Sequence, residues 1–234
     1  MKTRKKVVVL LSGGLDSTTL LWYGLNRGWE VRAVAVNYGQ RHSVELLMAT
    51  YQAKTAGVPL WVLDLAGLSK GLPGSSQTDL SVPVPEGHYT EETMKKTVVP
   101  NRNMILLSIA VGHAIGHGFD GVAYAAHAGD HAIYPDCRPE FTRRLGRAIA
   151  IADWRKIRLF RPFVRKTKAD IVRLGARLGV DYAYTWSCYQ GGKVHCGNCG
   201  TCVERREAFF LAGVPDPTPY AETAKPLEQL LKRS

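Results

Sequence analysis

One short stretch constrains the fold of this chain more than any other, because it joins an aliphatic run to a helical pattern through small polar residues. The stretch reads VVVLLSGGLDSTTLLW and runs from Val7 to Trp22. The aliphatic run indicates a buried parallel strand, and the apolar spacing after Ser17 indicates a helix. The first amides of such a helix have no partners within it, so they attract anions to the joint.

The residues at this joint predict a phosphate site. Gly13 and Gly14 allow a tight turn and the close approach of a bulky anion, and Ser12 and Ser17 add hydroxyl donors. Asp16 lies where a Walker loop would carry its Gly-Lys-Ser/Thr, so a GTPase-type or kinase-type loop is not expected. A carboxylate beside phosphates suits Mg²⁺, which prefers one or two carboxylates plus phosphate oxygens and water. The alternative is a plain strand–turn–helix joint with Asp16 as the helix N-cap.

Length and composition point to a single α/β domain with a small appendage, because 234 residues suffice for one proper core. No apolar run approaches the length of a membrane span, and MKTRKK at the N-terminus leads directly into the first strand. We therefore expect a soluble cytoplasmic protein without a signal peptide or membrane span. Four of the five cysteines crowd into 15 residues, which in a reducing compartment favours a metal over disulfides.

Strand and helix patterns alternate along the chain. We expect strands at 7–11, 31–37, 60–64, 121–126 and 157–160, and helices at 17–27, 44–56, 102–117, 140–151, 168–178 and 204–211. This order predicts a doubly wound parallel sheet of Rossmann-like α/β class. Ligands of such sheets bind at the carboxyl ends of the strands, so the loops after Leu11, Asn37, Asp64 and Ala125 should line one cleft.

Composition also suggests the domain boundaries. Residues 1–183 are expected to form the nucleotide-binding domain, 184–213 a small cysteine-bearing region with a helix, and 214–234 a proline-rich tail that ends in one or two amphipathic turns. Residues 66–98 are rich in Gly, Pro, Ser and Thr and show no period. A loop of this length is either a mobile lid or disordered, and we favour a lid.

The net charge of +11 is concentrated in one segment. Between Arg138 and Arg177 stand thirteen Lys and Arg residues against three acids. Such a segment can track a nucleic-acid backbone, hold small anionic substrates, or serve as solvated surface. No aromatic stacking motif or known RNA-binding module accompanies the charge, so we do not expect a nucleic-acid partner.

The cysteine cluster has the spacing of a tetrahedral metal site. Its members are Cys188, Cys196, Cys199 and Cys202. Four thiolates form a closed site, so we expect one structural Zn²⁺ per chain, with Gly197 and Gly200 allowing tight turns. An iron–sulfur cluster uses the same ligands, and a redox or persulfide role for one Cys-x-x-Cys pair is a further alternative. His195 is expected beside the metal or in solvent. Cys137 stands apart as either a nucleophile or a packed small residue.

The motif from Ser12 to Ser17 resembles the pyrophosphate loop (PP-loop) of the N-type ATP pyrophosphatases, whose fold is of the adenine nucleotide alpha hydrolase type. Further segments resemble the 7-cyano-7-deazaguanine synthase family, and they follow in the family's order. They are NYGQRHSVE from Asn37, VPNRN from Val99, YPDCRPEF from Tyr134 and the four cysteines. The resemblance runs from Val7 to about Phe210. In place of a Glu-Thr-Asp-type sequence the chain has His127, Gly129, Asp130 and His131.

This resemblance implies an ATP-dependent carbon–nitrogen ligase of queuosine precursor biosynthesis. The family joins 7-carboxy-7-deazaguanine and ammonia at the cost of two ATP, gives the nitrile preQ0, and releases AMP and pyrophosphate. Adenylation of the acid, and then of the amide, supplies a leaving group that the bare oxygen lacks. The resemblance also implies small-molecule substrates, a homodimer, and no membrane partner.

Roles for individual residues follow from the same resemblance. The ATP-binding residues would be Leu10, Leu11, Ser12, Gly13, Gly14, Leu15, Asp16 and Ser17. Arg102 is the candidate for the α-phosphate or the substrate carboxylate, because a guanidinium binds either in bidentate fashion. The candidates to face the cleft are Gln40, Arg41 and His42, unless they form a surface turn that caps a helix. The candidates for binding the deazaguanine are Tyr134, Asp136 and Arg138, although a structural turn at Pro135 explains part of that motif.

Two other functions remain open from the residues. A tRNA-modifying enzyme of the same fold, of thiolation or lysidine type, would use the basic segment 138–177 as its RNA track. A non-catalytic zinc module would use the cysteine cluster to bind a partner, but it leaves Asp16 unexplained.

Overall fold

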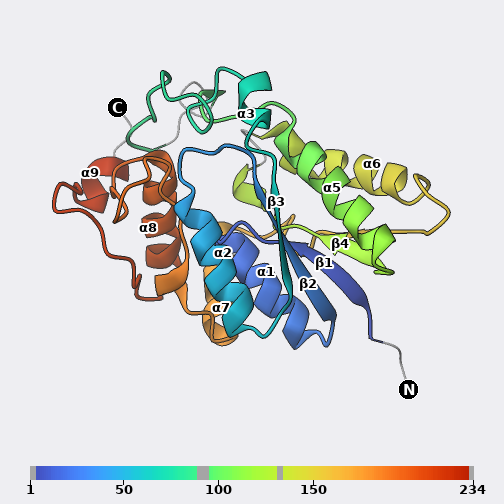
Figure 1. Ribbon diagram of the computed structural model, residues 1–234. Coiled ribbons are helices and arrows are strands. Elements are labelled where there is room, and N and C mark those ends of the chain that lie inside the picture. Colours follow the sequence, from blue (N-terminus) through green and yellow to red (C-terminus); the bar gives the residue numbers. More distant parts are fainter. Residues whose placement is uncertain (1–3, 89–94, 131–133, 232–234) are drawn as a thin grey trace.

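The computed structural model describes residues 4–88, 95–130 and 134–231, and it confirms the doubly wound sheet (Figure 1). Five parallel strands pair in the order β3-β2-β1-β4-β5. They are β1 (Lys6–Leu10), β2 (Glu30–Asn37), β3 (Leu60–Asp64), β4 (Gly121–Ala123) and β5 (Arg158–Phe160). The strand order reverses between β1 and β4, which is the place where such sheets bind ligands.

Helices cover both faces of the sheet. One face carries α1 (Leu15–Asn26), α2 (Val44–Thr55) and α7 (Lys168–Arg177), and the other carries α5 (Arg102–Gly116) and α6 (Pro139–Ile149) (Figure 1). Beside α7 lies α8 (Gly200–Ala212), followed by the short α9 (Leu227–Leu231). None of the helices in the described part of the chain combines the length and apolar character needed to cross a bilayer.

Strand β1 is buried on both faces of the sheet, which explains why the N-terminal run is aliphatic throughout and does not alternate with polar residues. Val7 and Val9 pack into the core formed with α1 and α7, whereas Val8 packs into the core formed with α5. All three side chains are fully buried, as expected for a central parallel strand covered on both faces.

Several element boundaries differ from those expected. The first strand ends at Leu10, one residue early, although the Leu11 amide still donates to the Val34 carbonyl (2.9 Å). The fourth strand ends at Ala123 and not at residue 126, because β5, its neighbour, ends at Phe160. The last long helix begins at Gly200 and not at residue 204, since Cys199 is its N-cap.

Segment 66–98, the expected lid, contains the short α3 (Leu68–Gly71), and part of it is packed into the molecule. Gln77 is fully buried, and its side-chain amide donates to the Thr97 carbonyl (2.6 Å). Arg41 donates from Nη2 to the carbonyl oxygens of Asp79 and Val82 (3.0 Å each) and so fastens the segment to the loop after β2. Residues 89–94 of this segment lie outside the described residues, and the motion of a lid stays a prediction.

Helix α7 lies against α1 at Gly175, and this contact depends on the absence of a side chain. The hydroxyl of Tyr182 shares a hydrogen bond with Thr19 (2.9 Å) and lies near the carbonyl oxygens of α7. A Cβ at Gly175 would overlap that hydroxyl and would come within 2.9 Å of Thr19 Oγ1.

We expect Gly175→Ala to lower the free energy of unfolding by about 1–3 kcal/mol, because the buried Tyr182 hydroxyl must move to make room. Gly112→Ala is the matched control, since a Cβ at this position in α5 meets no atom within 4 Å. The control should gain roughly 0.5–1 kcal/mol from the better helix propensity of alanine. Urea unfolding followed by circular dichroism measures both, and equal stability of the two variants would contradict the tight contact at Gly175.

Candidate functional site

A cavity of about 250 Å³ opens at the carboxyl ends of β1, β2 and β4. The loops expected after the first, second and fourth strands do line it, through Ser12, Tyr38 and His127 among others. The loop after Asp64 does not, which corrects the expectation. Strand β3 is at the edge of the sheet, and its Asp64 carboxylate instead accepts hydrogen bonds from Asn37 and the Ala66 amide. Gln77 of segment 66–98 lines the cavity in its place.

The loop between β1 and α1 gathers hydroxyl and amide groups at the start of a helix. The Ser12 amide donates to Ser17 Oγ (3.1 Å), the two serine hydroxyls share a hydrogen bond (2.9 Å), and the Gly14 amide donates to Ser12 Oγ (3.2 Å). Gly13 has φ 81°, and a Cβ there would overlap the Glu45 carbonyl of α2. The predicted turn therefore exists and requires glycine, and its donors lie at the positive end of the α1 dipole.

Asp16 lies in the first turn of α1, but Gly14 is the N-cap, so the simple capping role for Asp16 is excluded. Its Oδ2 lies 3.6 Å from Nε2 of His127 and 3.9 Å from Nζ of Lys168. Burial alone would raise the pKa of this carboxyl, but the charges of Lys168 and His127 outweigh burial and hold the pKa below its ordinary value. Its Oδ1 is buried and has no hydrogen-bond partner among the described residues.

Two groups near Asp16 were missed in the sequence, Lys168 and Glu204, whereas His127 lies on a loop that was expected to line the cleft. Lys168 is the first residue of α7, and it also pairs with Glu204 of α8 (Nζ to Oε2, 2.9 Å). The start of α7 is marked in the sequence, because Thr167 and Asp170 form a capping box. No local sequence pattern shows which residues Lys168 contacts, because these contacts depend on how α7 packs on the sheet.

Arg102 begins α5 and lines the cavity, as the role predicted for it requires. Its Nη1 donates to Gln77 Oε1 (2.9 Å) and to the Tyr38 hydroxyl (3.3 Å), both neutral acceptors. Among the described residues no carboxylate lies within ion-pair distance of it. Burial disfavours its charge, yet the oxygens of Tyr38, Tyr189 and Tyr134 offset that penalty and hold the pKa of Arg102 above its ordinary value. The guanidinium is therefore held in place and still able to bind an anion from outside.

The motif around Gln40 divides into three roles, and none is a surface turn. Gln40 is buried and donates to Glu45 Oε1 (2.9 Å), while its own oxygen accepts from the Tyr38 amide (2.9 Å). Arg41 points to segment 66–98 and does not line the cavity. His42 does line the cavity, and its ring stacks on Tyr189 with centroids 5.0 Å apart.

The motif around Tyr134 is likewise only partly in the site. Tyr134 and Cys137 line the cavity, whereas Asp136 and Arg138 do not. Asp136 accepts from the Asn103 amide (3.2 Å), and Arg138 is the N-cap of α6. A 3-10 turn from Pro135 to Cys137 turns these two residues away, so the structural alternative holds for them.

The loop after β4 also enters the site. His127 lines the cavity, and Ala128–Asp130 form a 3-10 turn behind it. His131 lies outside the described residues.

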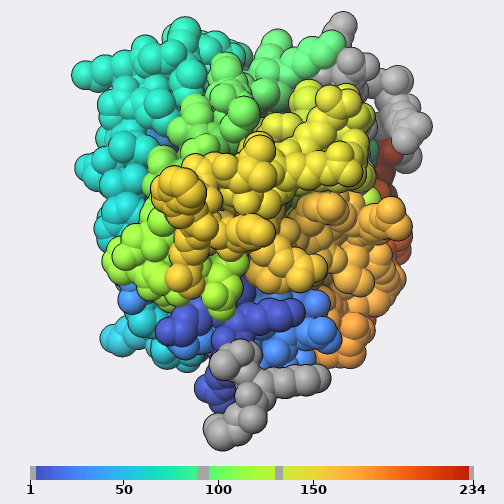
Figure 2. Space-filling model, turned by 90° about the vertical axis from the view of Figure 1, so that its right-hand side faces the viewer, coloured from blue at the N-terminus to red at the C-terminus, as the bar shows by residue number. Residues whose placement is uncertain are grey.

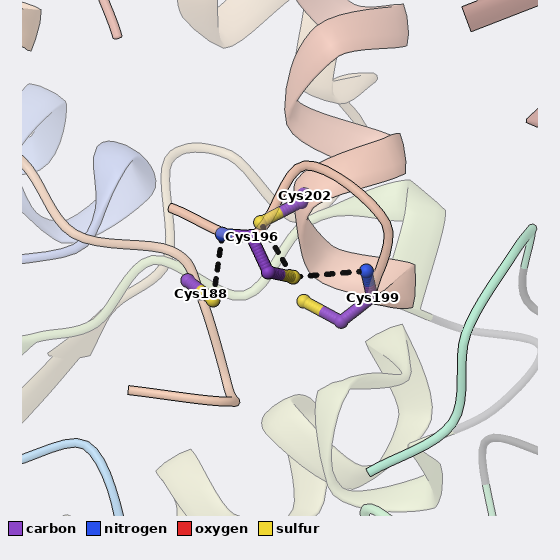
Figure 3. A group of neighbouring side chains, drawn as sticks. All are labelled: Cys188, Cys196, Cys199 and Cys202. Atoms are coloured by element: carbon purple, nitrogen blue, oxygen red, sulfur yellow. Dashed lines mark hydrogen bonds between the residues drawn. The ribbon is translucent and has the colours of Figure 1, made fainter. Parts of the chain in front are cut away.

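The four predicted cysteine ligands converge on one point (Figure 3). The sulfur atoms of Cys188, Cys196, Cys199 and Cys202 all lie within 4.8 Å of one another. A single ion at about 2.3 Å from each sulfur of a tetrahedron would place the sulfurs about 3.8 Å apart, and two of them, on Cys196 and Cys202, are 3.9 Å apart. The four residues therefore form a metal-binding site.

Backbone amides complete this site. The amides of Asn198 and Cys199 donate to Cys196 Sγ (3.4 and 3.3 Å) across a turn in which Gly197 has φ 78°. Gly200, the second expected turn glycine, is instead the first residue of α8. Hydrogen bonds from the neighbouring cysteine side chains hold the pKa of Cys199 below its ordinary value.

The cysteine segment also forms a wall of the cavity. Trp186, Tyr189 and Glu204 line it, and the Trp186 amide donates to the Gly13 carbonyl (2.9 Å). His195 lies outside the coordination set, as expected, but it is buried and not in solvent. Its Nε2 accepts from the Ser187 amide (3.0 Å), and burial, with the charge of Arg205, lowers its pKa to about 4, which leaves the ring neutral.

Comparisons of the sequence with known proteins match most of the chain. A family model described as "Queuosine biosynthesis protein QueC" matches residues 6–213. The 7-cyano-7-deazaguanine synthase of Paracoccus denitrificans (strain Pd 1222) is 52% identical over 219 residues, which cover 93% of this chain and 94% of that protein. The protein of the same name from Methanoregula boonei is 49% identical over 215 residues, covering 92% of this chain and 99% of the relative.

A solved structure shares the fold. It is the U34-tRNA thiolase NcsA from Methanococcus maripaludis with its [4Fe-4S] cluster, and it matches with a TM-score of 0.51 and 17% identity. The match covers 88% of this chain and 64% of that chain. At this level of identity the likeness concerns the fold alone.

We expect Cys199→Ser to lower both the metal content and the free energy of unfolding, because metal binding to such a site is folding energy. The fully buried Cys199 supplies one of the four sulfurs. Cys137→Ser is the matched control, since Cys137 is also a buried free cysteine but lies outside the cluster. Elemental analysis and thermal unfolding of both variants test this, and a Cys199 variant with full metal content would exclude the four-sulfur site.

Proposed function

Because the chain belongs to the queuosine biosynthesis protein QueC family, we infer that it makes 7-cyano-7-deazaguanine, the product in the name of its relatives. We further propose that it does so as an ATP-dependent ligase, from 7-carboxy-7-deazaguanine and ammonia, with AMP and pyrophosphate as the other products. The observation that carries this proposal is that one cavity holds both an anion cradle at Ser12–Ser17 and a guanidinium without a carboxylate partner among the described residues.

ATP would bind with its outer phosphates in the loop after β1. The Ser12 and Ser17 hydroxyls and the first amides of α1 would hold the β and γ phosphates. Leu10 and Leu11 line the same cavity and would pack against the nucleotide. As pyrophosphate leaves, these donors would stabilise the charge that develops on it, and the Lys168 ammonium lies close enough to Asp16 to add to that effect.

The residues around Asp16 fit a magnesium ion. Oδ1 of Asp16 is buried without a partner among the described residues, beside a loop built for phosphates, and a carboxylate with phosphate oxygens is a common ligand set for Mg²⁺. We propose that Asp16 holds the ion. When bound, Mg²⁺ would neutralise phosphate charge and so favour departure of pyrophosphate.

Arg102 would hold the carboxylate of 7-carboxy-7-deazaguanine against the α-phosphate of ATP. A guanidinium binds a carboxylate in bidentate fashion, and Gln77 and Tyr38 fix its orientation. Attack of the carboxylate oxygen on the α-phosphorus would form the acyl adenylate and release pyrophosphate. Ammonia would then displace AMP to give the amide, and adenylation of the amide oxygen would allow AMP to leave once more as the nitrile forms. One cavity serves both rounds, since each uses the same phosphate cradle.

The four-cysteine site fits zinc, and we propose one structural Zn²⁺ per chain. Four thiolates within 4.8 Å of one another suit a single tetrahedral ion, and all four positions are taken by protein. A [4Fe-4S] cluster would bind each thiolate to a different iron and so spread the sulfurs further apart.

The comparisons favour this small-molecule reaction over direct modification of tRNA, because the relatives at about 50% identity bear the name of the synthase. The basic segment 138–177, coloured yellow to orange, spreads over one face of the molecule (Figure 2). Part of its charge is internally paired, for example Arg144 with Glu140 (2.7 Å) and Arg173 with Asp170 (3.1 Å). We also propose a homodimer, on the family resemblance alone, which sedimentation equilibrium distinguishes from a monomer.

The experiment that tests the function is an assay of the protein with ATP, 7-carboxy-7-deazaguanine and ammonium. Mass spectrometry should find the nitrile, and chromatography should find AMP in a ratio of two per nitrile. Formation of ADP in place of AMP, or turnover only when tRNA is present, would overturn the proposal.

We expect Asp16→Asn to reduce AMP formation by about 100-fold or more, a typical loss for a group that supports charge in the transition state. The change keeps the size of the side chain and removes the charge proposed to hold Mg²⁺. Asp153→Asn, on an exposed loop, is the matched control and should keep full activity. Thermal unfolding should show both variants folded, because Lys168 keeps Glu204 as a partner. An active Asp16 variant would remove this residue from the phosphate site.

We expect Arg102→Met to raise KM for 7-carboxy-7-deazaguanine by about 100-fold, the equivalent of roughly 2.7 kcal/mol, while KM for ATP changes only a few-fold. The exposed Arg147→Met is the control for loss of a positive charge. Steady-state kinetics with each substrate varied in turn give the result. A larger effect on ATP than on the acid would move Arg102 from the carboxylate to the α-phosphate.

A further inference from the structure

A chain of oriented hydrogen bonds ends at the imidazole of His42, in the wall of the cavity. The Tyr38 amide fixes Gln40, whose side-chain nitrogen donates to Glu45 Oε1 (2.9 Å). The other carboxylate oxygen, Oε2, lies 3.2 Å from Nε2 of His42. All of these groups are buried or nearly so, with His42 2% and Glu45 9% exposed. The carboxylate therefore holds the imidazole in one orientation.

This arrangement assigns the proton on the ring. In a neutral imidazole only one nitrogen carries hydrogen, and a carboxylate within hydrogen-bond distance of Nε2 requires that hydrogen to be on Nε2. Nδ1 then carries the lone pair. This nitrogen is buried and has no hydrogen-bond partner among the described residues. A buried polar atom without a partner is unfavourable, so its presence in a residue that lines the cavity calls for a functional explanation.

The environment of His42 limits what that function can be. Among the described residues, the titratable groups that contact His42 are Glu45, which pairs with Nε2, and Tyr189, whose ring stacks on the imidazole with centroids 5.0 Å apart. The phosphate cradle already has its own hydroxyl and amide donors, and Arg102 is available for a carboxylate. A buried carboxylate that orients a histidine, and so leaves the lone pair of the second ring nitrogen available to accept a proton, is instead typical of a general base.

We propose that His42 is the general base that removes a proton from ammonium in the amide-forming step, an inference that rests on the proposed ligase. Nδ1 takes one proton from ammonium and leaves neutral ammonia. The nitrogen lone pair forms the bond to the carboxyl carbon, while the bond from that carbon to the oxygen of AMP breaks and its electrons leave with AMP. The new amide nitrogen loses its surplus proton to water. Glu45 is a positioning residue that keeps the lone pair on Nδ1.

The test separates adenylation from the attack of nitrogen. His42→Gln keeps a donor for Glu45 but has no basic nitrogen. Exchange of labelled pyrophosphate into ATP, dependent on 7-carboxy-7-deazaguanine, measures adenylation without ammonium and should stay within about threefold of the unmodified protein. The rate with ammonium should fall by about 100-fold or more. Hydroxylamine, which is already unprotonated at neutral pH, should restore capture of the adenylate. Rising pH, which supplies free ammonia, should narrow the gap.

Two further variants complete the design. Glu45→Gln should show the same pattern at smaller amplitude, a loss with ammonium and rescue by hydroxylamine, and it decides the matter if the His42 variant fails to fold. His117→Gln, on an exposed histidine at the end of α5, is the matched control and should behave like the unmodified protein. An unchanged rate with ammonium, or a parallel loss of pyrophosphate exchange, would overturn the role of His42. An absence of exchange in the unmodified protein would instead overturn the ligase itself.

Discussion

The close approach of Gly13 to the backbone of α2 is the contact on which the site depends. No side chain fits at Gly13, because a Cβ there would overlap the Glu45 carbonyl. The contact packs the loop after β1 against α2, which also carries Glu45, the partner of His42. The carbonyl of Gly13 in turn accepts a hydrogen bond from the amide of Trp186, in the cysteine-bearing region 184–213. A single glycine thus fixes the loop after β1 relative to two other walls of the cavity.

The charged groups of the cavity are unevenly paired: Asp16 has charged or titratable neighbours, whereas Arg102 has none that carries a negative charge among the described residues. Asp16 stands between His127 and Lys168, and Lys168 is shared with Glu204. Arg102, at the start of α5 on the other face of the sheet, has only neutral hydrogen-bond partners among the described residues. The cavity therefore has a region suited to phosphate with a cation and a separate region suited to a carboxylate. Adenylation of an acid requires both in one enclosure, where charges interact more strongly than in water.

The sequence was sufficient to predict the parallel sheet, the glycine-dependent turn between β1 and α1 and the convergence of four sulfur atoms, because each rests on a local pattern. A few neighbouring residues are enough to recognise each pattern: the aliphatic run of β1, the glycines at its end, and the Cys-x-x-Cys spacing. Lys168, Glu204 and Gln77 were missed because their positions depend on packing between segments more than 50 residues from the phosphate loop. We predicted three further residues in the cleft because they belong to the same motifs: Arg41, Asp136 and Arg138. The turns in which they lie direct their side chains elsewhere. A motif identifies a segment, and only the local backbone decides which of its side chains enter the site.

The hydrogen bond from Trp186 to Gly13 has a consequence for how the protein responds to metal supply. The sheet has its own apolar cores, and these do not include Cys188, Cys199 and Cys202, which form a separate cluster with Trp186. Trp186 joins that cluster to the cavity, because its indole nitrogen donates to the Cys188 carbonyl while its amide donates to the Gly13 carbonyl in the loop after β1. Because Trp186 belongs to both, we expect loss of an ion from the four sulfurs to disturb the loop at Gly13 before it disturbs the cores of the sheet.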